Sequence, residues 1–248
     1  MDESELRMDK VLTLKARIKN GEMINGIGIP MCSQKKDLER ILEEVEFDFF
    51  NIDCQHGPQS EVRISELCGA AGELGVPVNL RIKNTRQTYL IGNFLDLGPA
   101  GIIVPEVEKK SSVREAVSSF YYPQIGIRSW GGRTRYRIDE KSDRVEYASW
   151  WNKTGVLWIQ LESINAVLNC RKLAIDGVDV VTFGPKDLMF DIESYQYPPF
   201  LTLEDCVRYV VREMQDTSVA VSLALQDSSE QSKYRDLGLT ILQTPMVV

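Results

Sequence analysis

Eight short apolar runs, separated by stretches with helical spacing, are the feature that most constrains how this chain can fold. Most of the runs are continuously apolar rather than alternating, which is typical of parallel strands covered on both faces. The segments between them repeat apolar residues at helical spacing, as in Leu38, Ile41 and Val45. The expected strands cover residues 25–29, 49–53, 77–82, 100–105, 155–162, 178–184, 219–224 and 239–243.

A strand followed by a helix, repeated along the whole chain, predicts an α/β fold of the (β/α)8 or TIM-barrel type. The length of 248 residues suits one such barrel, so a single domain over residues 1–248 is expected. An additional helix is expected before the first strand, over residues 5–20. An open, doubly wound sheet is the alternative, although no Gly-x-Gly-x-x-Gly motif follows the first strand to indicate a dinucleotide site.

Two parts of the chain depart from this repeat. Residues 121–152 form a long connection rich in Gly, Arg, Trp and Tyr. Connections of this length are often lids or binding loops, so an active-site loop is expected, with a surface excursion closed by an aromatic plug as the equal alternative. The chain also ends at Val248, just after the eighth strand, which predicts a truncated C-terminus lacking the eighth helix. The leading helix or a neighbouring subunit would then cap the barrel.

Charge and composition argue against several classes of function. The net charge of −7 is unlike that of a general nucleic-acid binder, which needs a basic surface. The five cysteines are scattered and form no Cys-x-x-Cys pair, so neither a disulfide framework nor a thiolate zinc site is expected. The N-terminus is charged, and no apolar stretch approaches the roughly 20 residues that cross a bilayer. A soluble, cytoplasmic protein is therefore expected.

The chain has a single histidine, His56, which follows the second expected strand in Asp53-Cys54-Gln55-His56-Gly57-Pro58. An Asp near a His can orient the imidazole and tune its basicity, which a general base near neutral pH needs. A loop histidine that only caps or packs is the commoner situation for one such residue taken alone. The case for chemistry therefore depends on what the other strands carry at their ends.

Polar or charged residues end five consecutive strands, at the edge where (β/α)8 enzymes form their active sites. Glu162 and Asp187 are hard oxygen ligands suited to Mg²⁺ or Mn²⁺, or else rim carboxylates bonded to backbone N–H groups. Arg81 can hold a carboxylate in a bidentate manner, or can pair with a neighbouring acid, Asp53 or Glu106. The five ends carry Asp53 and His56, then Arg81, Glu106, Gln160 with Glu162, and Gly184-Pro185-Lys186-Asp187.

These residues, in this order, resemble the HpcH/HpaI-type class II (metal-dependent) pyruvate aldolase family. Typical members are 4-hydroxy-2-oxoheptanedioate aldolase and 2-keto-3-deoxyrhamnonate aldolase, and macrophomate synthase is a relative. The resemblance covers about residues 15–245. Its motifs are Asp53-x-Gln55-His56-Gly57-Pro58, Val78-Asn79-Leu80-Arg81, Val104-Pro105, Gly126-Ile127-Arg128, Gln160-Leu161-Glu162 and Gly184-Pro185-Lys186-Asp187-Leu188.

The resemblance implies a phosphoenolpyruvate-mutase-like barrel with a divalent metal, Mg²⁺ or Mn²⁺, held by Glu162 and Asp187. Pyruvate or another 2-oxo acid would chelate that metal. Arg81 would steady the keto oxygen and the developing enolate, because a cation stabilises an enolate better than a neutral ketone. His56, supported by Asp53, would drive proton transfer through bound water. Further substrate contacts are expected from Gln160, Gly184, Pro185, Lys186 and Arg128.

The chain also departs from the family pattern. Many members have Glu-His where this chain has Gln55-His56, and small residues are usual where it has Lys186. A cation at that position would weaken metal binding or hold an anionic substrate group. The long connection contains Arg128-Ser129-Trp130-Gly131 rather than the usual Arg-Gly, which indicates an unusual acceptor pocket.

The expected function is that of a carbon–carbon lyase: retro-aldol cleavage, or aldol addition, of a 2-oxo acid with an aldehyde or acyl partner, through a metal-stabilised enolate. One alternative is a citrate-synthase-like enzyme of siderophore or secondary metabolism that condenses oxaloacetate with an acyl-CoA. Another is a non-catalytic barrel that binds a small carboxylate. A homo-oligomer is expected, with neither a nucleic-acid nor a membrane partner.

Overall fold

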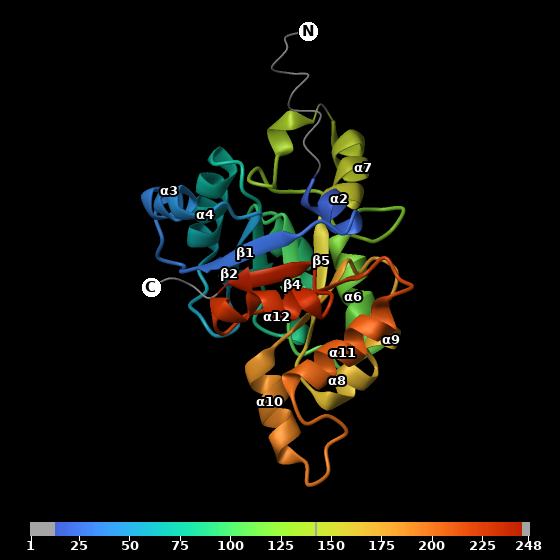
Figure 1. Ribbon diagram of the computed structural model, residues 1–248. Coiled ribbons are helices and arrows are strands. Elements are labelled where there is room, and N and C mark those ends of the chain that lie inside the picture. Colours follow the sequence, from blue (N-terminus) through green and yellow to red (C-terminus); the bar gives the residue numbers. More distant parts are fainter. Residues whose placement is uncertain (1–12, 142, 245–248) are drawn as a thin grey trace.

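The fold is a closed barrel of eight parallel strands arranged in sequence order, with β8 paired to β1. The computed structural model describes residues 13–141 and 143–244, and Figure 1 shows how its elements are arranged. The barrel confirms the fold class expected from the repeated apolar runs. The strands are β1 (Ile24–Ile29), β2 (Phe49–Asp53), β3 (Val78–Arg81), β4 (Gly101–Val104), β5 (Val156–Leu161), β6 (Val180–Phe183), β7 (Ala220–Ala224) and β8 (Ile241–Thr244).

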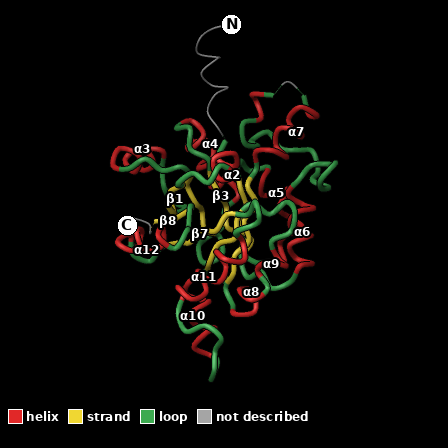
Figure 2. The backbone as a smooth tube through the Cα atoms, turned by 45° about the vertical axis from the view of Figure 1, so that its right-hand side comes forward, coloured by secondary structure: helices red, strands yellow, loops and turns green. Residues whose placement is uncertain are grey.

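Helices surround these strands, as Figure 2 shows. The main core lies between the two layers, where apolar side chains from both are buried against each other. The helices are α2 (Leu14–Lys19), α3 (Lys35–Glu44), α4 (Glu61–Glu73), α5 (Ile91–Leu95), α6 (Lys110–Phe120), α7 (Arg144–Thr154), α8 (Ile164–Leu168), α9 (Cys170–Leu173), α10 (Pro185–Ser194), α11 (Leu203–Met214) and α12 (Gln231–Asp236). Short 3-10 helices are η1 (Thr85–Leu90), η2 (Ile138–Glu140) and η3 (Ser228–Glu230).

A second, smaller core fills the barrel interior at the N-terminal ends of the strands. The rings of Phe49 and Trp158 lie there with centroids 5.4 Å apart, among Ile24, Val180 and other apolar residues. Gly26 makes room for them, because a Cβ at that position would lie 2.2 Å from the Phe49 ring. This end of the barrel is therefore a packed core, and any site that binds a ligand has to form at the other end.

Helix α2 belongs to this apolar end. Its Leu14 and Ile18 are part of the small core, and its Lys15 forms a buried ion pair with Asp179, at 3.0 Å. The leading helix expected over residues 5–20 is thus observed at Leu14–Lys19, while residues 5–12 lie outside the described part of the chain. Residues 245–248, where the chain was expected to end without an eighth helix, also lie outside it.

The long segment 121–152, for which an active-site loop is one of two expectations, lies away from the C-terminal ends of the strands of its own barrel. It connects α6 to β5 and therefore delivers the chain to the N-terminal end of a strand, the end opposite a (β/α)8 active site. Lys15 of α2 donates a hydrogen bond to the Gly155 carbonyl just after this segment, at 3.0 Å. Figures 1 and 2 both show α7 and α10 at opposite ends of the molecule.

Aromatic side chains pack against one another within the segment, as the alternative of a surface excursion with an aromatic plug describes. The rings of Tyr122, Trp130 and Tyr147 contact one another with centroids 5.7–6.0 Å apart. The Arg135 guanidinium stacks on Trp130 at 3.7 Å. Stacking of this kind orders an excursion that has little regular secondary structure of its own.

Candidate active site

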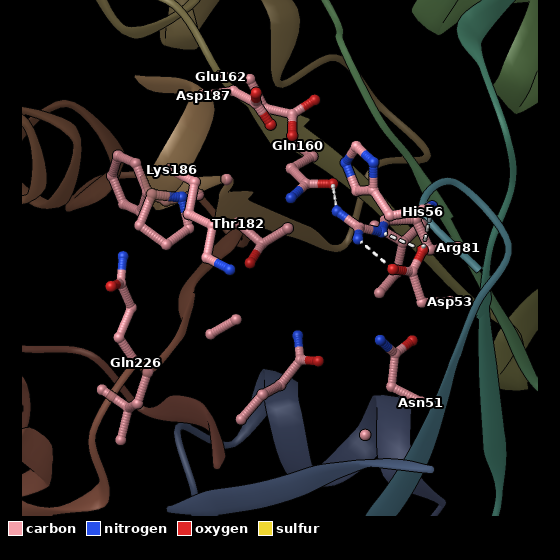
Figure 3. A pocket seen from close by; sticks show the side chains of 18 of the residues that line it. Asn51, Asp53, His56, Arg81, Gln160, Glu162, Thr182, Lys186, Asp187 and Gln226 are labelled. Atoms are coloured by element: carbon pink, nitrogen blue, oxygen red, sulfur yellow. Dashed lines mark hydrogen bonds and ion pairs between the residues drawn. The ribbon is translucent and has the colours of Figure 1, made fainter. Parts of the chain in front are cut away.

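A cavity of about 700 Å³ opens at the C-terminal ends of the strands (Figure 3). The strands position its side chains because alternate residues point into the barrel, so Asp53, Arg81 and Gln160 share the interior. It collects every expected site residue except Arg128. Its lining is Gly28, Asn51, Asp53, His56, Arg81, Ile103, Gln160, Glu162, Thr182, Phe183, Gly184, Pro185, Lys186, Asp187, Ala224, Leu225, Gln226, Gln243 and Thr244.

Asp53 and Arg81 form a bidentate ion pair across one side of the cavity. They are register partners at the ends of β2 and β3, so their side chains emerge side by side. Arg81 Nε and Nη2 lie 2.8 and 2.6 Å from the two carboxylate oxygens, and Nη1 lies 3.3 Å from Gln160 Oε1. Burial raises the pKa of the Asp53 carboxyl, but the Arg81 contacts outweigh burial and the pKa is lowered overall. Asp53 is therefore a fixed anion that orients the guanidinium.

His56 lies at the rim of the same cavity, exposed to solvent. The sequence suggests that Asp53 orients the imidazole of His56, but the structure gives the Asp53 carboxylate other partners. This carboxylate accepts hydrogen bonds from Arg81 and from the backbone N–H groups of Gln55, at 2.8 Å, and His56, at 3.4 Å. Gly57 closes this turn, since a Cβ there would lie 2.5 Å from the Asp53 carbonyl oxygen. The imidazole is thus placed by the backbone of the turn and faces the cavity.

Glu162 is the buried carboxylate of the site, with 8% of its surface exposed. Its Oε2 accepts the backbone N–H of Glu106 at 2.5 Å, while its Oε1 has no hydrogen-bond partner among the described residues. Glu106 directs that N–H by adopting a left-handed backbone, with φ 53°. Burial raises the pKa of Glu162 to about 7, and the nearby Asp187 charge adds to the effect, while the Glu106 N–H and Arg81 oppose it.

The segment Gly184-Pro185-Lys186-Asp187 forms the start of α10, and Pro185 is well suited to that position because its missing N–H has no helical partner there. Gly184 is required by close packing: a Cβ would lie 2.2 Å from Glu162 Oε1. Asp187 is exposed and lines the cavity near Glu162. The side chain of Lys186 reaches into the cavity, as Figure 3 shows.

Arg128, which is expected as a substrate contact, does not line this cavity of its own chain. Its guanidinium is buried at the other end of the barrel, paired with Asp96 at 2.9 Å and stacked on the Tyr122 and Trp151 rings, each at 4.7 Å. The reason is the topology of the segment that carries it, which follows helix α6 and leads into β5 instead of following the C-terminal end of β4 directly.

Several polar residues of the cavity were not anticipated from the sequence. Asn51, Thr182 and Gln243 lie in strands on the inward-facing positions, so the alternation within each strand was a signal that could have identified them. Gln226 and Thr244 follow or end the last two strands. Around Glu106, the side chains of Gln55 and Asn84 donate hydrogen bonds to its carboxylate, which holds the turn after β4 in place.

The donor set suits a hard divalent cation with few protein ligands. Within the described residues there is no group of three or more His, Cys, Asp and Glu able to enclose a metal ion. Glu162 and Asp187 would supply two carboxylates and leave the remaining coordination positions to substrate and water.

Among the helices of the described residues, none has the length and apolar character needed to span a membrane.

The model of the HpcH/HpaI aldolase/citrate lyase family matches residues 27–246. The chain belongs to this family. Membership confirms the resemblance noted in the sequence and the expected class of carbon–carbon lyase.

Named relatives are similar over most of the chain. The hydroxypyruvate/pyruvate aldolase of Cupriavidus necator is 27% identical over 88% of this chain and 81% of its own length. The 4-hydroxy-2-oxo-heptane-1,7-dioate aldolase of Escherichia coli is 25% identical over 91% of this chain and 85% of its own. The crystal structure of an HpcH/HpaI aldolase from Desulfitobacterium hafniense superposes with a TM-score of 0.83 at 26% identity, covering 96% of this chain and 91% of that one.

Proposed function

We propose that this protein forms or breaks the bond between the α carbon and the β carbon of a 2-oxo acid, counted from its keto group, with pyruvate or a similar acid as donor and an aldehyde or acyl compound as partner. The observation that carries the proposal is the convergence in one cavity of Arg81, the buried Glu162 with an unpartnered oxygen, and Asp187. Family membership and the aldolase relatives point to the same reaction class.

Glu162 and Asp187 would hold the divalent cation, Mg²⁺ or Mn²⁺. The fit rests on Glu162 Oε1, a buried oxygen without a partner among the described residues. When bound, such a cation supplies the positive charge that lowers the energy of an enolate relative to a ketone. Gly184 keeps the space beside that oxygen open.

Arg81 would bind the keto oxygen of the donor. Asp53 occupies Nε and Nη2, so Nη1, beside Gln160 Oε1, is the group left to face a ligand. A guanidinium held by a carboxylate cannot swing away, and it therefore presents its remaining N–H in a fixed direction. This preorganisation favours the charge that develops on the oxygen in the transition state.

His56 would move the proton, directly or through water. In the cleavage direction the base takes the proton of the hydroxyl group two carbons from the carbonyl. The electron pair of the carbon–carbon bond passes into the enolate, the aldehyde leaves, and the enolate carbon then takes up a proton. The exposed imidazole at the cavity rim suits this role because it can exchange its proton with solvent.

Exchange of the pyruvate methyl protons in D₂O tests this proposal without knowledge of the partner. We expect exchange that depends on Mg²⁺ or Mn²⁺, that falls roughly 100-fold or more in His56→Ala, and that is lost in Glu162→Gln. Lys36→Met, on the exposed face of α3, is the matched control and should exchange at the wild-type rate. A folded wild-type protein that exchanges no faster than the metal alone would refute the enolate reaction.

We also propose a homo-oligomer and a cytoplasmic location. Phe190, Tyr197 and Leu201, on α10 and the segment after it, are 76%, 86% and 72% exposed, and exposed large apolar side chains close together in the chain suit an interface. Light scattering on the wild type and on Phe190→Glu/Tyr197→Glu tests the assembly. A wild-type mass above that of one chain, which falls in the variant, supports it, and a monomeric wild type contradicts it.

The cytoplasmic location is supported by the five free cysteines, which suit a reducing compartment.

A further inference from the structure

Lys186 is a cation in the cavity that the reaction described above does not use. It is exposed on the first turn of α10, and its amine makes no hydrogen bond or ion pair within the described residues. Arg81, by contrast, is already paired with Asp53. Figure 3 shows the Lys186 amine reaching into the cavity on the side away from Asp53 and His56.

A second group on this side also lacks a partner. Thr182, on β6, is 2% exposed, and its Oγ1 has no hydrogen-bond partner among the described residues. Buried hydroxyl groups are ordinarily hydrogen-bonded, so this oxygen marks a place where a ligand or water completes the structure. The Gln226 amide, after β7, lies on the same side of the cavity in Figure 3.

The size of the cavity places this corner beyond the donor. A volume of about 700 Å³ is far larger than a three-carbon acid fills. The donor is assigned to Arg81, Glu162 and Asp187, and Lys186, Thr182 and Gln226 line part of the space that the donor leaves open. Among these three side chains, Lys186 offers a positive charge and Thr182 an unpartnered hydroxyl group to the part of the substrate that is not pyruvate.

We propose that Lys186, with Thr182 and Gln226, binds a second carboxylate of the substrate, so that this enzyme prefers a substrate with a carboxylate remote from the reacting carbon. One ammonium group and two neutral donors match a single negative charge. A phosphate dianion is commonly held by several cations, whereas these three side chains together carry one positive charge. The inference rests on the proposed aldolase function and specifies its substrate class.

The test compares aldehydes that differ only in a terminal carboxylate, with pyruvate as donor. Glyoxylate, malonate semialdehyde and succinate semialdehyde are paired with acetaldehyde, propanal and butanal, and kcat/KM is measured for each pair. The wild type should prefer the acid at one chain length or more by about tenfold to a hundredfold, the range of a charge-assisted hydrogen bond. The preferred length reports how far Lys186 lies from the reacting carbon.

Lys186→Met should abolish most of this preference, and Lys186→Arg should retain part of it. Thr182→Val, which removes the hydroxyl group at nearly constant volume, should reduce the preference severalfold. Lys36→Met removes the same charge from a distant surface and should keep the wild-type ratio. Because the ratio compares two substrates on one protein, an effect of Lys186 on the neighbouring metal ligand cancels.

Oxaloacetate against pyruvate, each with acetaldehyde as acceptor, distinguishes the two places where the carboxylate can be carried. Loss of selectivity between aldehydes in Lys186→Met supports the inference. Loss of selectivity between donors alone contradicts it, because the second carboxylate of oxaloacetate is bonded to the reacting carbon. A wild type without any such preference, or a preference that survives in Lys186→Met, overturns the inference while pyruvate exchange in D₂O remains intact. Absence of that exchange in the wild type overturns the proposed function, and the inference with it.

Discussion

At the scale of single residues, the site depends on which carboxylate side chain forms an ion pair with each positively charged side chain. The sequence left Arg81 open between a substrate and an ion pair with Asp53 or Glu106, and it assigned Asp53 to His56. The parallel register decides the matter, because it sets Asp53 beside Arg81 at the ends of adjacent strands. Register is a property of two strands in contact, and so the residues could be predicted from one sequence while their pairing could not.

Replacement of Arg81 by Lys tests the value of that bidentate pair. An ammonium group cannot bind two oxygens of Asp53 and still present a third N–H in a fixed direction. We expect the rate of pyruvate exchange to fall about 100-fold, with a circular dichroism spectrum like that of the wild type. An Arg81→Lys variant that unfolds, or that exchanges at the wild-type rate, would show that the pair is structural rather than part of the site.

Gly184 gives a second test at this scale. In Gly184→Ala the new Cβ would lie 2.2 Å from Glu162 Oε1, so the carboxylate has to move away from the position assigned to the metal. We expect exchange to fall at least tenfold and the free energy of unfolding to fall by about 1–3 kcal/mol. Gly28→Ala is the matched control, because Gly28 lines the same cavity and a Cβ there would meet nothing within 4 Å. Equal losses in both variants would contradict the steric argument.

At the scale of elements, the strands could be predicted more fully than the connections. Each of the eight expected runs contains or overlaps one observed strand, because a parallel strand buried on both faces is apolar along its length. The length and composition of segment 121–152 predict an active-site loop or, equally, a surface excursion with an aromatic plug, and they do not decide between the two. Its position after a helix and before a strand puts it at the N-terminal end, a topological fact that composition does not encode.

Helix α2 is attached to that same end by a buried ion pair. Lys15 Nζ lies 3.0 Å from Asp179 and 2.9 Å from the Tyr121 hydroxyl, and both charged side chains are almost fully buried. Burial lowers the pKa of Lys15 and raises that of Asp179, and in each case the attraction of the partner opposes the effect. Loss of one partner would leave the other charge buried without compensation.

We therefore expect Lys15→Met to lower the free energy of unfolding by about 3–5 kcal/mol in urea denaturation. The double variant Lys15→Met/Asp179→Asn should recover part of that loss, because it removes the uncompensated charge. Pyruvate exchange per folded molecule should stay at the wild-type rate, since neither residue lines the cavity. A single variant within about 1 kcal/mol of the wild type would show that the pair contributes little.

At the scale of the whole molecule, the residues expected to stabilise the fold and the residues expected to react with substrate lie at opposite ends of the barrel. The N-terminal end is filled by the Phe49 and Trp158 rings and carries α2, while the C-terminal end holds the polar cavity. The Lys15–Asp179 pair and the Glu162 and Asp187 carboxylates lie at opposite ends of the barrel and share no partner, so changes at one end should add to changes at the other. Metal binding provides a way to measure this independence.

A cation that binds only the folded protein raises the free energy of unfolding by about 2.7 kcal/mol at a hundred times its dissociation constant, which for a domain of this size corresponds to roughly 5–10 °C in Tm. We expect millimolar Mn²⁺ or Mg²⁺, added after treatment with EDTA, to raise the Tm of the wild type by several degrees. Glu162→Gln and Asp187→Asn should lose this increase. Lys15→Met should begin from a lower Tm and keep the increase in full, because its defect lies at the other end of the barrel. The same increase in Glu162→Gln would place the metal elsewhere, and its loss in Lys15→Met would show that the two ends are energetically coupled.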